Sequence, residues 1–417
     1  MKEKDFTAKN AKIKEAIAQT RAKRKSQQCK VFDLKIVENK LSKRQLEDLK
    51  MQFVESKWLY NDMLAWCKED PLNKPSNYKI RDIVKVKNKD GQFEERKLEH
   101  LSVQARQALQ VQMISSIKTL STLKKKGYKI GPLKFKANYN VLHLKQFKTM
   151  YSFKGGNWMK IQGIYRLVYV KGLHQIPVNA EFANAKLLNA PDGYHLKVTV
   201  FLPKEEIVHN GKEVGIDFGC STAFTLSTGE KINCSIGETE RLKRLQRKLE
   251  FLKKGSNNRR KLIKAIQKEY LKINNRKNDA ANKIVHRLLN EFSLVAIQDE
   301  QLNAWKENHH GKAVQHSVLG RVKAKLKQSP KVYVCSKWEA TTKTCSNCGH
   351  KQEMSEKIRV YDCPKCGLHL DRDVNAAINI LKVVPMERRE VKACSTQEAA
   401  TLFSVKKSCG SSPGAFR

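Results

Sequence analysis

Four cysteines near the end of the chain stand in two pairs whose spacing suits a metal ion. Two residues separate Cys345 from Cys348, and Cys363 and Cys366 repeat this spacing fourteen residues later. A glycine follows each pair directly and relieves the backbone beyond it. Four converging thiolates hold a tetrahedral Zn²⁺ and leave no open position for water, so we expect one structural zinc ion here. The alternative is a redox pair or two unrelated buried dithiols.

Three acidic residues form a second group with possible chemistry. Asp217, Glu300 and Asp373 each lie beside an apolar segment, and each alone is more typical of a helix cap, a surface acid or a salt bridge. Together they offer the carboxylate oxygens that hard divalent ions prefer. Two such ions, roughly 4 Å apart, can activate the water and stabilise the leaving oxygen in phosphodiester hydrolysis. The three acids therefore indicate a nuclease that uses two Mg²⁺ ions.

Short apolar segments must position these acids. Asp217 ends the strand-like run that begins at Val214, Glu300 follows a second apolar run at 294–297, and Asp373 precedes a helix start. The turn at 227–229 predicts an antiparallel hairpin after the first strand. We expect a new domain to begin near residue 210.

A strongly basic helical hairpin is predicted between the first two acids, over residues 238–290. Its apolar stripe is broken by Gly255-Ser256-Asn257-Asn258 and consists of Leu242, Leu245, Leu249, Leu252, Leu262, Ile266, Tyr270 and Ile273. Residues 241–277 contain fifteen Lys or Arg and two Glu. This excess favours a nucleic-acid-binding surface over a solvated face. The candidate contacts here are Arg259, Arg260, Lys261 and Lys264.

The first half of the chain reads as three segments. Residues 1–30 carry ten Lys or Arg and three acids, and predict a mobile or weakly helical arm that orders on a phosphate backbone, or a solvated tail. Residues 41–127 predict two helices joined by a loop, and 128–208 alternate as strands do. The run at 31–37 can supply the first strand of one barrel, so that the helices are an insertion.

Specific residues support these two helices. The first has a stripe of Leu46, Leu49, Phe53, Tyr60, Leu64 and Cys67. In the second, Ser102 is a candidate N-cap, and the inward-facing residues are Leu109, Met113, Ile117 and Leu120. The second helix ends in the basic run Lys124, Lys125 and Lys126, a further candidate nucleic-acid contact.

The composition points to a polyanionic partner. The 417 residues include 82 Lys or Arg and 41 Asp or Glu, a net charge of +41. Nucleic acid is the leading partner. A membrane is not expected, because no apolar run approaches about 18 residues. The opening residues MKEKDF show no signal peptide. The 11 cysteines, among them the isolated Cys220 and Cys335, are too dilute for a disulfide scaffold, which favours a reducing compartment. We expect a cytoplasmic location, in the prokaryotic cytosol or nucleoid.

Four motifs carry a resemblance to a known family. They are VGIDFG at 214–219, QDEQL at 298–302 with Trp305, TCSNCG at 344–349 and DRDVNAA at 371–377. These residues resemble the split RuvC and zinc-ribbon motifs of the TnpB family, transposon-encoded RNA-guided nucleases related to compact type V CRISPR effectors. The resemblance is specific over roughly 210–382, where order and spacing agree, and diffuse over the first 208 residues.

The resemblance implies a fold, partners and site roles. It implies an RNase H-like domain interrupted by a zinc ribbon, a guide RNA, recognition of a short adjacent motif in double-stranded DNA, and metal-dependent cleavage after guide pairing. By position, Asp217, Glu300 and Asp373 match the three catalytic acids. Asp299 is a rival to Glu300, because many members place Glu directly after the strand, and Asp371 is the neighbour most easily confused with Asp373.

The resulting expectation is a multidomain α+β protein. A wedge-like β-barrel module with an inserted helical lobe precedes an RNase H-like (RuvC) α/β domain interrupted by a zinc ribbon. The expected segments are a basic arm (1–30), the β-rich module (31–40 and 128–208), the helical recognition lobe (41–127), the RuvC-like domain (210–334 and 367–383), the zinc ribbon (335–366) and a disordered tail (384–417).

Three functions remain open at this point. The leading hypothesis is an RNA-guided DNA endonuclease with two catalytic Mg²⁺ and one structural Zn²⁺. The alternative is a nuclease-inactive, RNA-guided or zinc-ribbon DNA-binding regulator, although the presence of all three acids argues against it. A weaker third possibility is a junction nuclease that cuts branched DNA without RNA.

Overall fold

A computed structural model describes residues 2–88, 90–204, 211–220, 222–305, 311–355 and 358–389. The chain divides into two compact units, Met1–Glu205 and Glu206–Arg417, which are described separately. Among the described residues, none of the helices has the length and hydropathy that crossing a bilayer requires.

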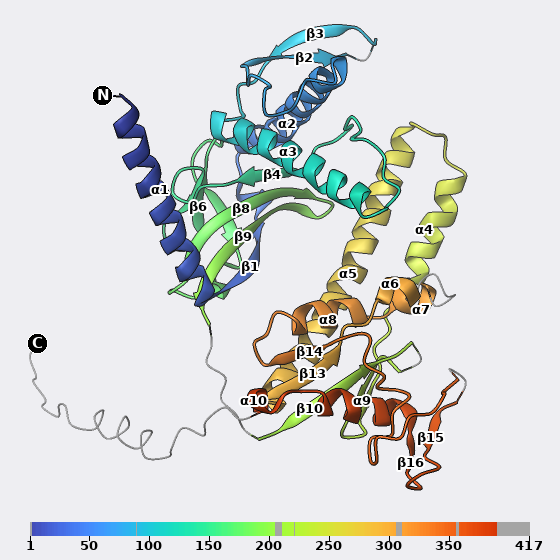
Figure 1. The fold of residues 1–417 in the computed structure, drawn as a ribbon. Coiled ribbons are helices and arrows are strands. Elements are labelled where there is room, and N and C mark those ends of the chain that lie inside the picture. Colours follow the sequence, from blue (N-terminus) through green and yellow to red (C-terminus); the bar gives the residue numbers. More distant parts are fainter. Residues whose placement is uncertain are drawn as a thin grey trace, which may run out of the picture. The chain divides into compact units, whose positions relative to one another are not determined.

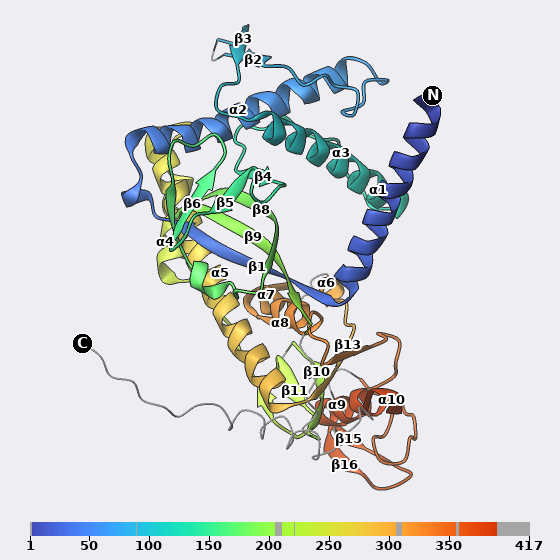
Figure 2. The ribbon, with the colours of Figure 1, turned by 90° about the vertical axis from the view of Figure 1, so that its left-hand side faces the viewer.

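The first unit is built on a seven-stranded antiparallel sheet (Figures 1 and 2). Its elements in chain order are α1 (Lys2–Lys25), β1 (Gln27–Ile36), η1 (Glu38–Lys40), α2 (Lys43–Glu69), β2 (Ile83–Lys87), β3 (Phe93–Lys97), α3 (Val103–Lys125), β4 (Val141–Leu144), β5 (Tyr151–Phe153), β6 (Trp158–Ile161), β7 (Val168–Lys171), η2 (Leu173–Gln175), β8 (Glu181–Ala190) and β9 (Gly193–Pro203).

The strands lie in the order β4-β8-β9-β1-β7-β6-β5. Strand β1 pairs with β9 over nine residues and with β7 at its end, so the segment carrying α2 and α3 lies between strands of one sheet. The sheet is nearly closed on itself. The Tyr151 hydroxyl on edge strand β5 donates to the Ala183 carbonyl on β8 at 2.9 Å, and the rings of Phe147 and Phe182 stack at 4.7 Å.

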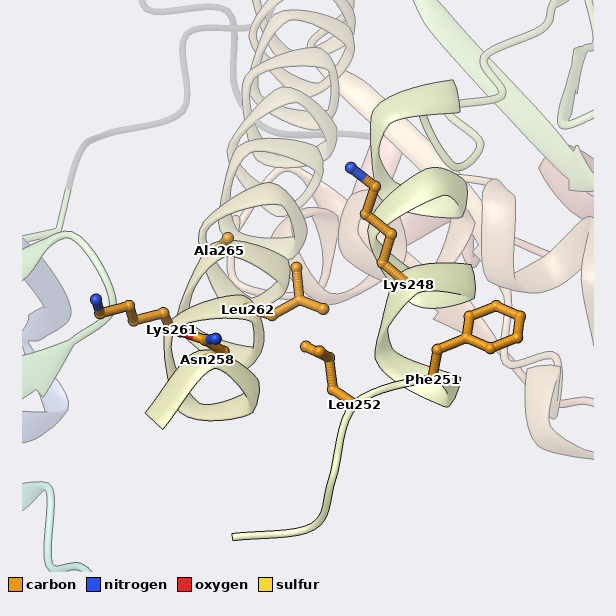
Figure 3. A pocket seen from close by; sticks show the side chains of 7 residues that line it. All are labelled: Lys248, Phe251, Leu252, Asn258, Lys261, Leu262 and Ala265. Atoms are coloured by element: carbon orange, nitrogen blue, oxygen red, sulfur yellow. The ribbon is translucent and has the colours of Figure 1, made fainter. Parts of the chain in front are cut away.

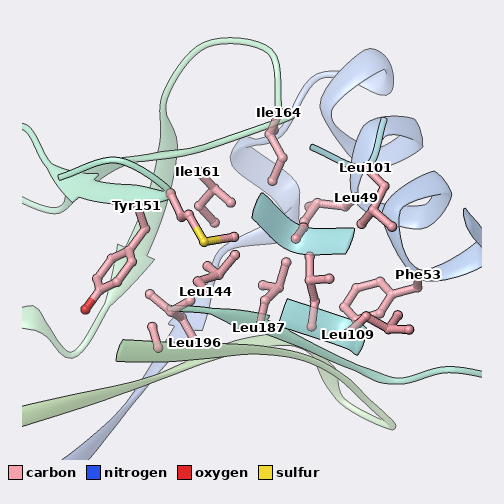
Figure 4. Packing of buried hydrophobic residues seen from close by; sticks show 14 of the residues in the cluster. Leu49, Phe53, Leu101, Leu109, Leu144, Tyr151, Ile161, Ile164, Leu187 and Leu196 are labelled. Carbon is pink, nitrogen blue, oxygen red and sulfur yellow. The ribbon is translucent and has the colours of Figure 1, made fainter. Parts of the chain in front are cut away.

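One apolar core joins this sheet to α2 and α3 (Figure 4). Leu49 and Phe53 of α2 and Leu109 of α3 pack against Leu187 and Leu196 of the sheet. The predicted cap is present, because Ser102 accepts a hydrogen bond from the Ala105 amide at 3.3 Å. Ser42, which the sequence analysis does not single out, forms a capping box with Gln45. These contacts fix both helices on the sheet.

Several details of the first unit differ from the expectations. Residues 2–25 form helix α1, and β1 begins at Gln27. The helix end is held by Glu181, which pairs with Lys23 at 2.9 Å and Arg24 at 2.7 Å. The expected loop between α2 and α3 contains the hairpin β2–β3. Ile117 is exposed because the core reaches only the first half of α3.

The second unit contains a mixed five-stranded sheet in the order β12-β11-β10-β13-β14. Its elements are β10 (Glu213–Phe218), β11 (Phe224–Leu226), β12 (Lys231–Ile232), α4 (Glu240–Glu250), α5 (Asn257–Glu291), β13 (Leu294–Gln298), α6 (Leu302–Trp305), α7 (Gly311–His316), α8 (Leu319–Leu326), β14 (Val332–Cys335), β15 (Val360–Asp362), β16 (His369–Asp371), α9 (Arg372–Lys382) and α10 (Met386–Arg389).

Helices cover both faces of this sheet, and the alternation of β13 shows why. Val295 and Ile297 pack with α5 and α8, whereas Leu294 and Ala296 pack with Ile380 of α9. Strand β10 runs parallel to β13 and antiparallel to β11, so the hairpin predicted at residues 227–229 is formed by β11 and β12 on the other side of β10.

The helical hairpin and the tail also differ in detail from the expectations. The predicted break lies between α4 and α5, and within it Ser256 caps α5, because its hydroxyl accepts from the Arg259 amide. Tyr270 is exposed, and its hydroxyl accepts from Gln246 at 2.8 Å. Met386–Arg389 form α10 within the expected tail, and residues 390–417 lie outside the described residues.

Gly215 of β10 lies so close to the backbone of α9 that we expect no larger residue to be tolerated there. A Cβ added at Gly215 would lie 2.0 Å from the Ala377 carbonyl oxygen, which belongs to the backbone and cannot rotate away. Gly215→Ala should therefore lower the free energy of unfolding by about 3 kcal/mol or more. Urea denaturation measures it.

Gly320→Ala is the matched control for this substitution. A Cβ there meets only the Leu302 Cδ1 at 3.7 Å, and the residue lies in helix α8. This change should leave stability unchanged or raise it by up to about 1 kcal/mol. Equal stabilities of the two variants would contradict the close contact.

Candidate functional site

Two parallel strands bring the first two acids to one edge of the sheet. Ile216 of β10 lies opposite Ile297 of β13. The carboxyl ends of parallel strands meet at the same edge, where β10 carries Asp217 and Glu300 lies two residues beyond the end of β13. The two predicted strands therefore place the Cα atoms of Asp217 and Glu300 at the same end of the sheet.

Helix α9 brings the third acid to the same place. Gly215 packs on the backbone of α9, and Asp217 lies two residues further along β10, so its side chain points to the same face of the sheet. Asp373 lies in the first turn of α9. The structure thus gathers the three acids that the sequence singles out.

The site is electrostatically unfavourable without a cation. Burial, together with the nearby charges of Asp373 and Glu300, raises the pKa of Asp217 to about 8. The Arg372 guanidinium opposes this shift. Burial also raises the pKa of Glu300. The carboxylates of Asp217 and Glu300 therefore resist ionisation because of their surroundings.

The carboxylates interact without forming a compact ligand shell. Within the part of the chain that the structure describes, only the cysteine cluster brings three or more Cys, His, Asp or Glu ligand atoms all within 4.8 Å of one another. Asp373 and Glu300 are therefore close enough to raise the pKa of Asp217, but the ligand atoms of the three acids do not all lie within 4.8 Å of one another.

Asp299 and Glu300 have different surroundings. Asp299 is half exposed and pairs with Lys323 of α8 at 2.9 Å and with Lys327, the C-cap of that helix, at 2.6 Å. The Lys327 contact is the main reason that the pKa of Asp299 is lowered. Lys323 also donates to the Glu300 carbonyl. These lysines hold Asp299 away from Asp217 and leave the Glu300 side chain available to the site.

Asp371 and Asp373 also have different hydrogen-bond and ion-pair partners. Asp371 is the N-cap of α9: its Oδ1 accepts from the Asp373 amide at 2.9 Å, and its Oδ2 pairs with Lys231 at 2.7 Å. The Asp373 carboxylate instead pairs with Arg372 at 3.0 Å, and Arg359 lies 4.0 Å away. The Asp371 carboxylate thus has a structural role, as the N-cap of α9 and the partner of Lys231.

The four cysteines lie together as the spacing predicts. The Sγ atoms of Cys345 and Cys366 are 3.6 Å apart, and those of Cys348 and Cys363 are 3.5 Å apart. The glycine after each pair has a positive φ, 76° and 69°, which other residues adopt with strain. The cluster can hold one metal ion.

The sequence analysis missed a polar network that joins this cysteine cluster to α9. The buried Asn375 accepts from the Ser346 amide and donates to the Thr344 carbonyl, both at 2.8 Å. Asn379 donates to the carbonyls of Thr341 and Thr344. Two asparagines four residues apart within an apolar helix stripe are the signal that could have revealed it.

The predicted basic contacts fall into two groups. Arg260, Lys261 and Lys264 of the hairpin are exposed, and so is the run at 124–126. Arg259 is half-buried, and its guanidinium donates to the carbonyls of Leu249 at 2.5 Å and Leu252 at 2.9 Å. Its role in the structure is therefore to join the ends of α4 and α5.

The raised pKa of Asp217 predicts how stability depends on pH in metal-free protein. The folded state retains a proton that the unfolded state loses near pH 4, so stability falls as the pH rises from about 4 to 8, by up to about 1.4 kcal/mol per pH unit. Asp217→Asn removes this loss and should be more stable than the parent protein at pH 8. Thermal denaturation in EDTA measures the difference.

Asp299→Asn is the control, because its pKa is shifted in the opposite direction. This variant should be no more stable than the parent protein at pH 8. If the stability difference between Asp217→Asn and the parent protein does not grow from pH 5 to pH 8, the Asp217 carboxylate is not in the unfavourable environment described here.

The two family models that match the chain lie mainly in the second unit. A family model described as "Probable transposase" matches residues 195–308, and one described as "Cas12f1-like, TNB domain" matches residues 319–380. A cryo-EM structure of a Cas12f1–sgRNA–target DNA complex covers 81% of this chain and 82% of its own, with 15% identity and a TM-score of 0.48.

Curated relatives match over shorter stretches. A putative RNA-guided DNA endonuclease of Streptomyces pristinaespiralis is 33% identical over 178 residues, which are 40% of this chain and 44% of the relative. TnpB-like protein L79 of Acanthamoeba polyphaga mimivirus is 32% identical over 142 residues, 31% of this chain and 26% of the relative. The chain thus spans less than half the length of these curated relatives. The two family models and these relatives show that the chain is similar to TnpB-like proteins over part of its length.

Proposed function

We propose that this chain is an RNA-guided DNA endonuclease with an RNase H-like (RuvC) catalytic domain. The observation that carries the proposal is the buried Asp217 carboxylate beside Asp373 and Glu300, on a chain whose net charge is +41. Such a chain can bind nucleic acid over its basic surfaces, and the acids repel phosphate unless cations are present. The names of the relatives support RNA guidance and a DNA target.

The proposed residues fit divalent cations. Carboxylate oxygens are the ligands that Mg²⁺ prefers, and positive charge would relieve the repulsion that raises the pKa of Asp217. Asp217, Glu300 and Asp373 would hold two Mg²⁺ ions. Bound there, such ions activate an attacking water and stabilise the leaving oxygen of a phosphodiester.

Other residues of the chain prepare this site. Lys323 and Lys327 neutralise Asp299, so that it does not compete with Glu300. Lys231 and the first turn of α9 do the same for Asp371. Guide pairing would supply the sequence specificity, and the protein would contact the backbones and a short adjacent DNA motif.

The cysteine cluster has a structural role in this proposal. Cys345, Cys348, Cys363 and Cys366 would bind one Zn²⁺ and complete its coordination, which leaves no position for a substrate. Asn375 and Asn379 would transmit the position of the zinc-bound segment to α9, which carries Asp373. The ion would thereby help to place the third acid.

Cleavage assays on three variants test the catalytic assignment. Protein purified with its RNA should cut target DNA in Mg²⁺ and not in EDTA. Asp217→Ala and Glu300→Gln should lose at least about 10³-fold in rate, because each removes a carboxylate that balances the cations. Asp299→Asn should retain most activity, since Lys323 and Lys327 already bind that side chain.

DNA binding measured in parallel should be the same for all four proteins. An active Glu300→Gln beside an inactive Asp299→Asn would reverse the assignment of the second acid. Binding without cleavage by the parent protein in Mg²⁺ would instead support a nuclease-inactive regulator, and cleavage of branched DNA without RNA would support a junction nuclease.

Metal analysis tests the zinc assignment. The double variant Cys345→Ser/Cys348→Ser should lose about one zinc per chain and unfold at lower temperature, because a structural zinc contributes directly to folding. Cys29→Ser/Cys67→Ser, which changes two cysteines outside the cluster, should keep its zinc. Equal zinc content in the two double variants would exclude the four cysteines as ligands.

A further inference from the structure

The end of the basic hairpin carries an open cavity of about 530 Å³ (Figure 3). It lies where α4 and α5 are joined. Its apolar lining consists of Phe251, Leu252, Leu262 and Ala265, and its polar lining consists of Lys248, Asn258 and Lys261. The cavity therefore combines an aromatic ring, aliphatic side chains and two cations.

Phe251 is unusually accessible for an aromatic residue, with 86% of its surface exposed. A single exposed apolar side chain is common on protein surfaces and needs no explanation. Phe251 differs because it adjoins a hollow with an apolar lining, so a flat partner could contact the ring and the leucines together. A ring in this position gains free energy when a planar group covers it.

The charge around the cavity identifies the chemistry of that partner. Residues 241–277 contain fifteen Lys or Arg and two Glu. One of the two, Glu269, already pairs with Lys272 at 2.9 Å and Arg241 at 3.3 Å. The complementary partner is thus a polyanion that also offers flat apolar groups, which describes single-stranded nucleic acid.

The hairpin is held in a defined shape at this end. The Arg259 guanidinium donates to the carbonyls of Leu249, in the last turn of α4, and of Leu252, just beyond that helix, and Ser256 caps α5. The cavity is therefore formed before a partner arrives, which reduces the entropy lost on binding.

We propose that this cavity binds an unpaired nucleotide of an RNA, with its base stacked on Phe251 and its flanking phosphates paired with Lys248 and Lys261. RNA is the favoured source because loops of a folded RNA present unpaired bases, whereas double-stranded DNA presents them only after it opens. The inference rests on the proposed function, since it assumes that the chain binds RNA, and it adds a base-binding subsite remote in sequence from the acids.

Binding of defined oligonucleotides to the full chain, in EDTA, tests the subsite. The probes are fluorescent twelve-residue oligouridylate, an abasic RNA of the same length and oligothymidylate. Phe251→Ala should bind oligouridylate roughly 5- to 100-fold more weakly than the parent protein, the range expected for losing one base stack. Phe251→Trp should retain the affinity, and both variants should bind abasic RNA as the parent protein does.

Ile263→Ala is the matched control, because Ile263 is exposed on the same hairpin and does not line the cavity. Its affinity for oligouridylate should be unchanged. Lys261→Gln should lower the slope of log K against log salt by about 0.7, the contribution of one phosphate contact to a single strand.

The outcomes separate this inference from the proposed function. Equal oligouridylate binding by Phe251→Ala and the parent protein, or failure of Phe251→Trp to restore affinity, would overturn the subsite while leaving RNA binding and cleavage intact. A loss confined to oligothymidylate would overturn the assignment to RNA. If the parent protein bound no RNA at all, the proposed function would fail with it.

Discussion

Repulsion among carboxylates confined to one sheet edge is the constraint on which the second unit depends. The position of Asp217 is fixed, because it lies on β10, which is paired with strands on both sides. Burial and two neighbouring acids oppose the ionisation of its carboxyl group. The nearby side chains limit the number of negative charges. Lysines bind Asp299 and Asp371, and Arg372 partly balances Asp373. Five acids thus lie at or next to the motif positions, and three of them, Asp217, Glu300 and Asp373, are close to one another in the structure.

The position of α9 links this acidic site to the cysteine cluster. The helix packs on β10 through Gly215, and its asparagines bind backbone groups of the segment that begins at Thr341. Gln298, the last residue of β13, accepts a hydrogen bond from the Thr341 hydroxyl at 3.0 Å. A continuous set of hydrogen bonds therefore runs from the end of β13 to the helix that carries Asp373, and it passes beside the first cysteine pair.

The sequence predicts those features that short segments determine. Cysteine spacing, the cap at Ser102 and the break between the two hairpin helices are local, and each is present in the structure. The different surroundings of Asp299 and Glu300 arise from Lys323, 23 positions after Glu300, and Lys327, 28 positions after Asp299, which no local pattern shows. The hairpin β2–β3 was missed because its strands, IVKVK and FEERK, are too rich in charge for an apolar alternation. Arg259 was counted as a surface cation because its carbonyl partners are visible only after the hairpin folds.

At Gly215 and Ala377, the main chain of β10 packs on the main chain of α9 without an intervening side chain. Side chains change rotamer within nanoseconds, whereas a main-chain contact of this kind changes only when a whole element shifts. Thermal motion of the surrounding residues therefore alters the spacing between the bases of Asp217 and Asp373 very little. The precision of the acidic site consequently comes from a missing methyl group, and surface residues can diverge widely without disturbing it.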